Sequence, residues 1–132
     1  MSLVLVSHSK TLAEGLRDMI VQVAGDAVHV AAAGGTADGR LGTNAEAILE
    51  AIRAVDDGDG VLVLLDLGSA WLSVEMALAE LSETEQARVI VSEAPLVEGA
   101  VLAAVQASVG ASLSEVAAAA ARAASMSKAP GG

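Results

Sequence analysis

The 132-residue sequence contains no cysteine, no phenylalanine and no tyrosine, and it has only two prolines and one tryptophan. Without cysteine the chain forms neither disulfides nor thiolate metal sites, and nothing points to an oxidising compartment. With so few aromatic side chains, the core must be built from valine, leucine, isoleucine and alanine. These absences describe an aliphatic domain whose chemistry has to come from imidazole and oxygen groups.

Basic residues are also scarce. Seven Lys and Arg stand against 17 Asp and Glu, which gives a formal net charge of -10. A surface of that sign repels a phosphate backbone, so we expect no nucleic-acid partner. The two histidines, His8 and His29, lie on different predicted elements, so we expect no metal site. The chain has no GxxxxGK[ST] or GxGxxG motif, so we expect it to bind no nucleotide cofactor by itself.

Long hydrophobic runs are missing as well. The apolar start of the chain has no basic segment before it and is shorter than a membrane span. Later apolar runs are broken by Asp, Glu, Arg or Gly. We therefore expect a cytoplasmic protein that makes no contact with a membrane.

The length allows one domain, because single cores typically contain about 100 to 150 residues. We expect this domain to span residues 1–124. Residues 125–132 end in Pro-Gly-Gly and are expected to form a flexible C-terminal tail.

Short runs rich in valine and leucine alternate with longer segments of helical periodicity, which is typical of an α/β fold. We expect an open, mainly parallel four-stranded sheet in the order 2-1-3-4, with helices on both faces. The run at 61–65 is apolar throughout, as in a strand that is covered on both faces. The expected strands are 3–7, 28–33, 61–66 and 89–92, and the expected helices are 9–24, 44–55, 69–81, 97–108 and 112–124.

Several residue pairs predict where the helices start. A hydroxyl residue followed three positions later by Glu matches the capping box, in which two unpaired backbone amides are satisfied. Such pairs occur at Thr11 with Glu14, Thr43 with Glu46, and Ser112 with Glu115. Gly25 and Gly110 are expected near helix ends.

His8 directly follows the first strand and directly precedes the first helix. The first amides of a helix are unpaired and carry the positive end of its dipole, so a phosphoryl group on a neighbouring imidazole would be stabilised there. Neutral histidine is nucleophilic at cellular pH and forms a phosphoramidate that can be passed on. A lone histidine at such a rim is otherwise a solvated loop residue, and the surrounding motifs favour the chemical role.

Asp66 ends the third strand, which the order 2-1-3-4 places beside the first. A carboxylate bound to one imidazole nitrogen fixes the tautomer and leaves the other nitrogen free to attack. We therefore predict that Asp66 holds Nδ1 of His8 and that Nε2 faces the phosphoryl donor.

Four further residues are candidates for binding the phosphate: Ser9, Gly68, Ser69 and Thr43. Ser9 supplies an amide at the start of a helix, and Gly68 with Ser69 opens another helix after Asp66. Thr43 closes a glycine-rich loop at 34–43, at the sheet edge where α/β folds bind ligands. Ser69 is explained equally well as a helix cap, and for Thr43 capping is the favoured explanation.

Two other residues have less to do with the predicted chemistry. His29 lies within an apolar strand segment and is interpreted as structural. Trp71 is either a docking contact near the rim or part of the core.

Four short blocks stand out in order along the chain. They are VLVSHS at 4–9, GTNA at 42–45, LDLGSA at 65–70 and APLVEGA at 94–100. Together they resemble the phosphotransfer subunits of bacterial dihydroxyacetone kinases, which are similar to the mannose-type EIIA domains of the sugar phosphotransferase system. The last block favours the dihydroxyacetone branch over a sugar transporter component.

The resemblance implies a phosphotransferase component with a covalent phosphohistidine. His8 would accept phosphate from the phosphocarrier HPr and pass it to ADP on a separate, nucleotide-binding kinase subunit. Members of the family commonly form homodimers, and their fold is a mainly parallel sheet with helices. The alternative within the family is the EIIA component of a mannose-type sugar transporter.

Three protein classes outside the family share part of this pattern. A response-regulator receiver domain would need an acidic pair after the first strand to hold magnesium, and this chain has Ser7 and His8 there. A serine hydrolase would need a G-x-S-x-G elbow, and Ser69 follows Asp66 too closely to lie on a separate strand. A non-catalytic interaction module is the reading that failure of His8 to accept phosphate would favour.

Overall fold

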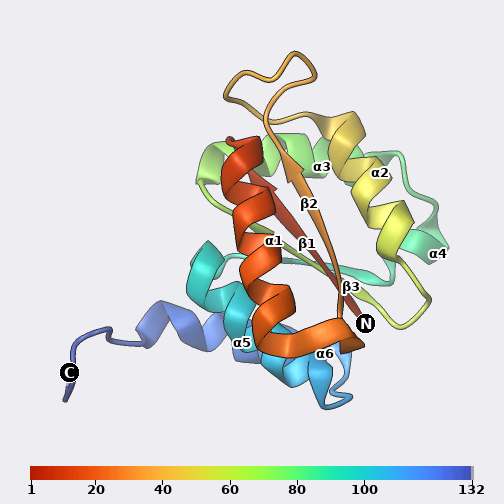
Figure 1. The fold of residues 1–132 in the computed structure, drawn as a ribbon. Coiled ribbons are helices and arrows are strands. Elements are labelled where there is room, and N and C mark those ends of the chain that lie inside the picture. Colours follow the sequence, from red (N-terminus) through yellow and green to blue (C-terminus); the bar gives the residue numbers. More distant parts are fainter. Residues whose placement is uncertain (132) are drawn as a thin grey trace.

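The computed structural model describes residues 1–131 as a four-stranded parallel sheet between two layers of helices (Figure 1). The strand order is β2-β1-β3-β4, with all neighbours parallel. This confirms the predicted fold class and order. The strands are β1 (Ser2–Ser7), β2 (His29–Gly34), β3 (Val61–Leu65) and β4 (Val89–Ser92).

The helices follow the predicted segments with some differences at their ends. The predicted helix 69–81 begins as a 3-10 turn, ends earlier, and is followed by a separate short helix that the sequence analysis missed. The predicted helix 112–124 tightens into a 3-10 turn over its last residues, as helix ends often do. The elements are α1 (Lys10–Ala24), η1 (Gly25–Ala27), α2 (Ala45–Val55), η2 (Gly68–Ala70), α3 (Trp71–Ala79), α4 (Glu83–Gln86), α5 (Leu96–Ser108), α6 (Leu113–Ala121) and η3 (Arg122–Ser125).

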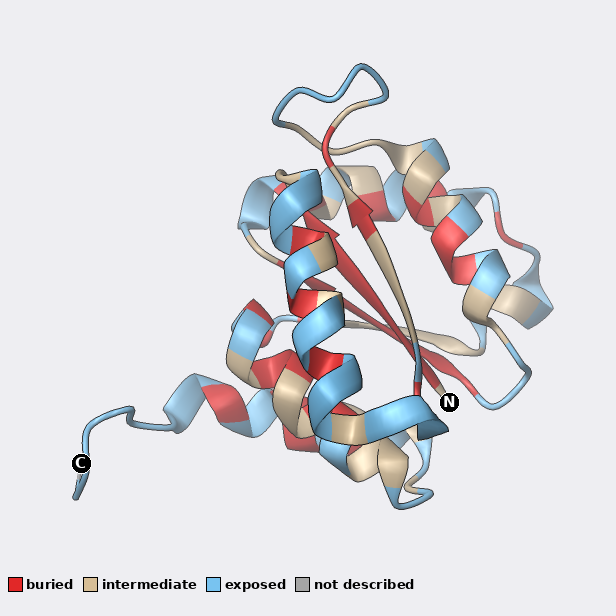
Figure 2. Ribbon diagram, in the orientation of Figure 1, coloured by how far each residue is buried: buried red, intermediate tan, exposed pale blue. Residues whose placement is uncertain are grey.

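The core has two halves, one on each face of the sheet, because successive strand side chains point to opposite faces. One half joins the sheet to α1, α5 and α6 around Leu3, Leu5 and Leu64. The other joins it to α2 and α3 around Val4 and Val63. Figure 2 shows the two central strands as the most completely buried part of the sheet, and every residue of β1 and β3 is buried. The prediction that the run at 61–65 is covered on both faces is confirmed.

Two of the three predicted capping boxes are wrong, as the residues at the helix starts show. The box at Thr11 is wrong, because the chain leaves its extended conformation at Ser9, whose hydroxyl caps α1. The box at Thr43 is also wrong, because Asn44 is the residue with extended backbone and its side chain caps α2. The box at Ser112 is confirmed, with both of its hydrogen bonds formed. In each failure the true cap is a neighbouring polar residue that the strand or loop geometry places at the helix start.

The glycines expected near helix ends do take the backbone conformation that favours glycine. Gly25 follows α1 with φ of +70°, and Gly110 lies two residues after α5 with φ of +86°. Further on, Ser125 still belongs to η3, and Lys128 forms an ion pair with Glu98 on α5 at 2.7 Å. Figure 1 shows the last residues leading away from the body of the domain. The predicted tail 125–132 ends at Gly132, which lies outside the described residues.

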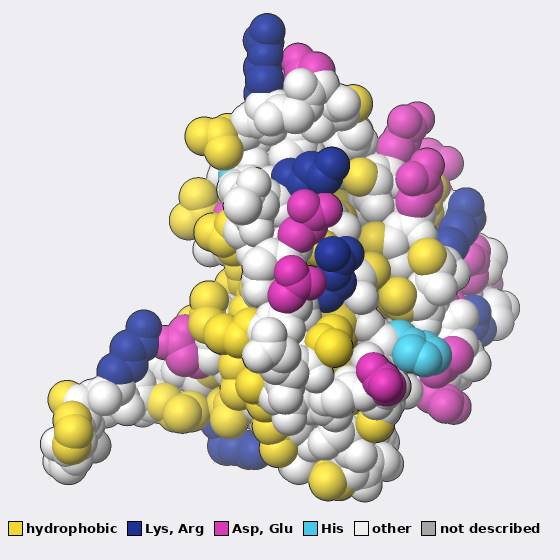
Figure 3. Space-filling model, in the orientation of Figure 1, with side chains coloured by type: hydrophobic (Ala, Val, Ile, Leu, Met, Phe, Trp, Pro, Cys, Tyr) yellow, Lys and Arg dark blue, Asp and Glu magenta, His cyan; other side chains and the backbone are white. Residues whose placement is uncertain are grey.

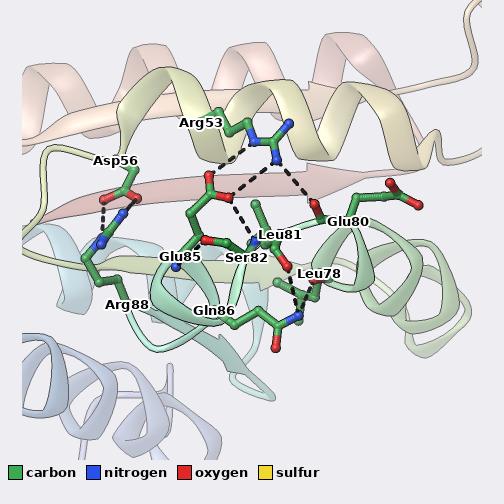
Figure 4. A network of polar contacts seen from close by, with 9 residues as sticks. All are labelled: Arg53, Asp56, Leu78, Glu80, Leu81, Ser82, Glu85, Gln86 and Arg88. Carbon is green, nitrogen blue, oxygen red and sulfur yellow. Dashed lines mark hydrogen bonds and ion pairs between the residues drawn. The ribbon is translucent and has the colours of Figure 1, made fainter.

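A network of polar side chains joins α2 to the α4 segment (Figure 4). The guanidinium of Arg53 binds the Glu85 carboxylate at 3.2 Å, and that of Arg88 binds the Asp56 carboxylate at 2.8 Å. The hydrogen bond from Arg88 lowers the pKa of Asp56 below its ordinary value, although burial opposes the shift.

In the structure over residues 1–131, no helix has the length and apolar character needed to cross a bilayer.

Candidate functional site

The ends of β1 and β3 meet at the carboxyl edge of the sheet. Val6 and Leu65 are register partners, and the amide of Asp66 donates to the carbonyl of Val6 at 3.0 Å. Asp66, the first residue after β3, therefore lies beside the end of β1. This brings His8, between β1 and α1, next to Asp66, as the predicted strand order implied.

Asp66 accepts a hydrogen bond from the imidazole of His8. The distance from Nδ1 of His8 to Oδ1 of Asp66 is 2.9 Å, and the backbone amide of His8 donates to Oδ2 at 2.9 Å. Two more donors complete the set, namely the amide of Leu67 to Oδ1 at 2.8 Å and the hydroxyl of Ser7 to Oδ2 at 3.0 Å. Each carboxylate oxygen thus accepts two hydrogen bonds, which fixes the orientation of the group.

These contacts also fix the charge of Asp66. Burial by itself would raise the pKa of this carboxyl group, whose side chain is only 15% exposed. The hydrogen bonds from His8, Ser7 and Leu67 outweigh that effect and lower the pKa below its ordinary value. The group is therefore a carboxylate at neutral pH and favours a proton on Nδ1 of His8.

The second ring nitrogen of His8 faces the outside of the molecule. Its Nε2 lies 2.9 Å from the hydroxyl of Ser69, which is an exposed residue of η2. With the ring proton on Nδ1, Nε2 is the acceptor and the Ser69 hydroxyl donates to it. The imidazole side chain is 25% exposed, so an incoming group can reach this nitrogen. Displacing the Ser69 hydroxyl from Nε2 would free both groups to bind a phosphoryl group.

The glycine-rich loop at 34–43 holds the backbone of His8. The amide of Gly42 donates to the carbonyl of His8 at 2.8 Å, and the amide of Gly35 donates to the carbonyl of Ser7 at 3.3 Å. A Cβ at Gly34 would lie 2.5 Å from the carbonyl oxygen of Ser9, so only glycine allows this close approach. The loop therefore supports the site through the backbone.

The remaining predicted phosphate-binding residues lie at different distances from the chemistry. Ser9 directly follows His8, with its hydroxyl committed to capping α1. Gly68 is exposed and opens η2 beside Ser69. Thr43 instead bonds to Ser73 at 2.6 Å, which joins the glycine-rich loop to α3 and does not involve His8.

Exposed leucines frame the site, and they were not among the residues predicted from the sequence. Leu12 in the first turn of α1, Leu41 in the loop, Leu67 beside Asp66 and Leu72 in the first turn of α3 are 45%, 79%, 58% and 66% exposed. We call these four residues the leucine rim. Figure 3 shows apolar side chains along the left margin of the molecule. The sequence feature that could have indicated this surface is a leucine in a predicted loop or in the first turn of a predicted helix.

Trp71 and His29 occupy different parts of the molecule. Trp71 is half-buried at the start of α3, where its indole N–H donates to Glu75 at 2.7 Å. It also lines a groove of about 380 Å³ together with Asp66, Leu67 and Pro95. His29 is exposed at the first position of β2, paired with Ser2, and so lies at the opposite edge of the sheet from His8. Within residues 1–131 no cluster of three or more His, Asp or Glu could hold a metal ion.

Comparison with known proteins gives one family model and a set of similar chains. The model described as PTS system fructose IIA component, EIIA-man, matches residues 2–117. The phosphoryl donor subunit DhaM of PEP-dependent dihydroxyacetone kinase 2 from Listeria innocua is 51% identical over 106 residues, which cover 80% of this chain and 84% of that protein. The crystal structure of EF1359, a protein of unknown function, superposes with a TM-score of 0.84 at 38% identity, covering 92% of both chains.

Some relatives are much longer than this chain. The DhaM subunit of PEP-dependent dihydroxyacetone kinase from Escherichia coli is 43% identical over 118 residues, which are 87% of this chain but 25% of that protein. The Lactococcus lactis phosphotransferase subunit DhaM is 34% identical over 74% of this chain and 75% of its own length. The matched region is thus common to short and long relatives.

Proposed function

This chain belongs to the EIIA-man family and to its DhaM-like members, and we propose that it is the phosphohistidine carrier of a phosphoenolpyruvate-dependent dihydroxyacetone kinase. His8 is the residue that carries the phosphoryl group. Phospho-HPr is the donor, and ADP bound on a separate kinase subunit is the acceptor. The carrier domain spans residues 1–124.

The observation that carries this proposal is the pair of contacts on the His8 ring. Nδ1 is held at 2.9 Å by the Asp66 carboxylate, while Nε2 faces an exposed hydroxyl at the rim of the sheet. A neutral imidazole with its proton fixed on the inner nitrogen presents a lone pair on the outer one, which is the form required of a nucleophile.

In the loading step, the Nε2 lone pair attacks the phosphorus of the donor. A P–Nε2 bond forms while the bond between phosphorus and the donor breaks, and its electron pair stays with the donor. Nδ1 keeps its proton, and the positive charge on the phosphorylated ring is stabilised by Asp66. In this mechanism the Ser69 hydroxyl and the backbone amides of Gly68 and Ser69 bind the phosphoryl oxygens.

In the unloading step, a terminal phosphate oxygen of ADP attacks the same phosphorus. The O–P bond of ATP forms, the P–Nε2 bond breaks, and its electron pair returns to Nε2. The imidazole is then neutral again with Nδ1 protonated, so the cycle closes without any net proton transfer to this chain.

The leucine rim gives the two partner proteins a surface on which to dock. Because the His8 side chain is only 25% exposed, a protein that brings phosphorus to Nε2 must cover the neighbouring leucines. Burying such side chains contributes favourably to association, roughly 25 cal/mol per Å² of apolar area before the costs of binding. Donor and acceptor must therefore use overlapping surfaces.

The test is phosphorylation of the purified chain by phosphoenolpyruvate, enzyme I and HPr, followed by intact-mass measurement. We expect one added phosphoryl group that is labile in acid, present in the parent and in His29→Ala and absent in His8→Ala. His29→Ala is the matched control, because His29 is exposed at the other edge of the sheet. A stable or absent phosphoryl group would contradict the proposal and favour an interaction module.

The acceptor is tested with the loaded chain. Transfer to ADP should require the nucleotide-binding subunit of a dihydroxyacetone kinase and should produce ATP. Transfer to a sugar transporter component in place of that subunit would assign the chain to the sugar branch. The proposal also includes a cytoplasmic location and a homodimer. Sedimentation of the intact chain would check the homodimer.

A further inference from the structure

Ser7 is a fully buried serine directly beneath the proposed site. It is the last residue of β1 and has no measurable exposed surface. Its hydroxyl lies 3.0 Å from Oδ2 of Asp66 and 3.0 Å from the backbone amide of Ser9. The proposed transfer steps do not involve the Ser7 hydroxyl directly.

The direction of the Ser7 hydroxyl proton follows from these two neighbours. An amide can only donate, so the Ser9 N–H takes a lone pair of the Ser7 oxygen. A carboxylate can only accept, so the Ser7 O–H must point at Asp66. One serine thus joins the start of α1 to the carboxylate that contacts the His8 ring.

The other three donors to Asp66 come from His8 and Leu67, which adjoin the reacting groups in the chain. Ser7 supplies the single side-chain hydroxyl, and it shares Oδ2 with the His8 amide. Without it, Oδ2 keeps one donor and the carboxylate gains freedom to rotate away from Nδ1. Burial leaves little water to replace the missing hydrogen bond.

We propose that Ser7 is a positioning residue, which acts through Asp66 to keep the ring proton of His8 on Nδ1 and its nucleophilic lone pair on Nε2. This role rests on the proposed function of His8. It does not require contact with the phosphoryl group, since Ser7 lies behind Asp66. Groups that orient a histidine in this way typically change its activity by about tenfold or more when removed.

A matched control exists in the same sheet. Ser92 is the last residue of β4, is buried at 7% exposure, and accepts a hydrogen bond from the amide two residues later at 3.1 Å. Ser7 makes the same kind of local contact with Ser9. Ser92→Ala therefore removes an equivalent buried turn contact without touching Asp66.

The test combines histidine NMR with the rate of phosphorylation. Long-range ¹H–¹⁵N spectra report which ring nitrogen carries the proton, and they need no partner protein. In the parent and in Ser92→Ala we expect the Nδ1–H tautomer. In Ser7→Ala we expect a substantial Nε2–H population and a rate of phosphorylation by phospho-HPr that falls roughly tenfold. Ser7→Thr, which keeps the hydroxyl, should restore both.

If Ser7→Ala does not fold, Ser7→Cys replaces it, because a thiol leaves no cavity and is only a weak donor. Its spectrum should show the same shift towards Nε2–H. An unchanged tautomer in a folded Ser7→Ala or Ser7→Cys variant would overturn the proposal, as would an equal loss of rate in Ser92→Ala. If the parent accepts no phosphate, the proposed function fails, and the tautomer measurement still decides the role of Ser7.

Discussion

Nδ1 of His8 and Oδ1 of Asp66 lie 2.9 Å apart, although the two residues are separated by 58 positions in the sequence. The adjacency of β1 and β3 in the sheet produces this contact, because both strands end at the same edge. The hydrogen bonds that surround Asp66 then fix both its orientation and its charge. The chemistry proposed for His8 depends on that arrangement.

Asp66→Asn should separate charge from shape at this contact. An amide offers one acceptor oxygen in place of two, so at least one of the surrounding donors loses its partner and the His8 tautomer is no longer fixed. We expect the phosphorylation rate to fall by about 10- to 100-fold and the free energy of unfolding to fall by about 1–3 kcal/mol. Rates measured by mass spectrometry and urea unfolding of the same preparation check both effects. A variant with the parent's rate would show that Asp66 does not orient His8.

Leu72→Glu should weaken docking while leaving the fold intact. Leu72 is 66% exposed, so replacing it removes little buried area from the monomer. A charge in the leucine rim must be desolvated when a partner covers it, and we expect KM for phospho-HPr to rise roughly tenfold with little change in kcat. Val109→Glu is the control, since Val109 is 75% exposed at the far end of α5 and carries the same added charge. Equal effects in the two variants would indicate net charge and not docking.

Gly34→Ala should destabilise the protein at the site. Its Cβ would lie within 3 Å of the Ser9 carbonyl and the Lys10 Cα, which are backbone atoms that cannot turn aside. We expect a loss of about 1–3 kcal/mol, as for other overpacked positions. Gly15→Ala is the opposite case, because Gly15 is exposed in the middle of α1 with no atom near its Cβ position. It should gain about 0.5–1 kcal/mol. Thermal or urea unfolding of both variants checks the signs.

The ion pair between Asp56 and Arg88 should contribute to acid sensitivity. The hydrogen bond from Arg88 lowers the pKa of Asp56 in the folded state, so the group stabilises the fold above its unfolded pKa of about 3.9. That stability is lost as pH falls through the lower folded-state pKa. Between pH 7 and pH 3 we expect unfolding free energy to decline less in Asp56→Asn than in the parent. Urea titrations across this range measure the slopes, and equal slopes would contradict the assignment.

Sequence patterns predicted the sheet well because its strands are chemically distinct. The run at 61–65 has no polar residue, and β1 is nearly as apolar, so the sequence indicates a central strand at each position. The helix starts were harder, because Ser9, Thr11, Thr43 and Asn44 are all good caps. Which of them caps a helix depends on where the preceding strand or loop ends in space.

The contact between His8 and Asp66 was predicted for the same reason. His8 and Asp66 each directly follow a strand, so their meeting follows from strand order alone. The contact between Ser7 and Asp66 depends on which way a buried serine points, and periodicity carries no such information. The short helix α4 was missed because four residues are too few to show a helical period, although Ser82 and Glu85 do form a capping box.

Trp71 provides a built-in fluorescent reporter for this surface. It is the sole tryptophan in a chain without tyrosine or phenylalanine, so the protein's intrinsic fluorescence arises from one indole. That indole is half-buried at the start of α3 and lines the groove that includes Asp66. A protein that docks over His8 would change the polarity around the ring and with it the emission wavelength. Binding of each partner can therefore be followed by titration without any label, in the unmodified chain.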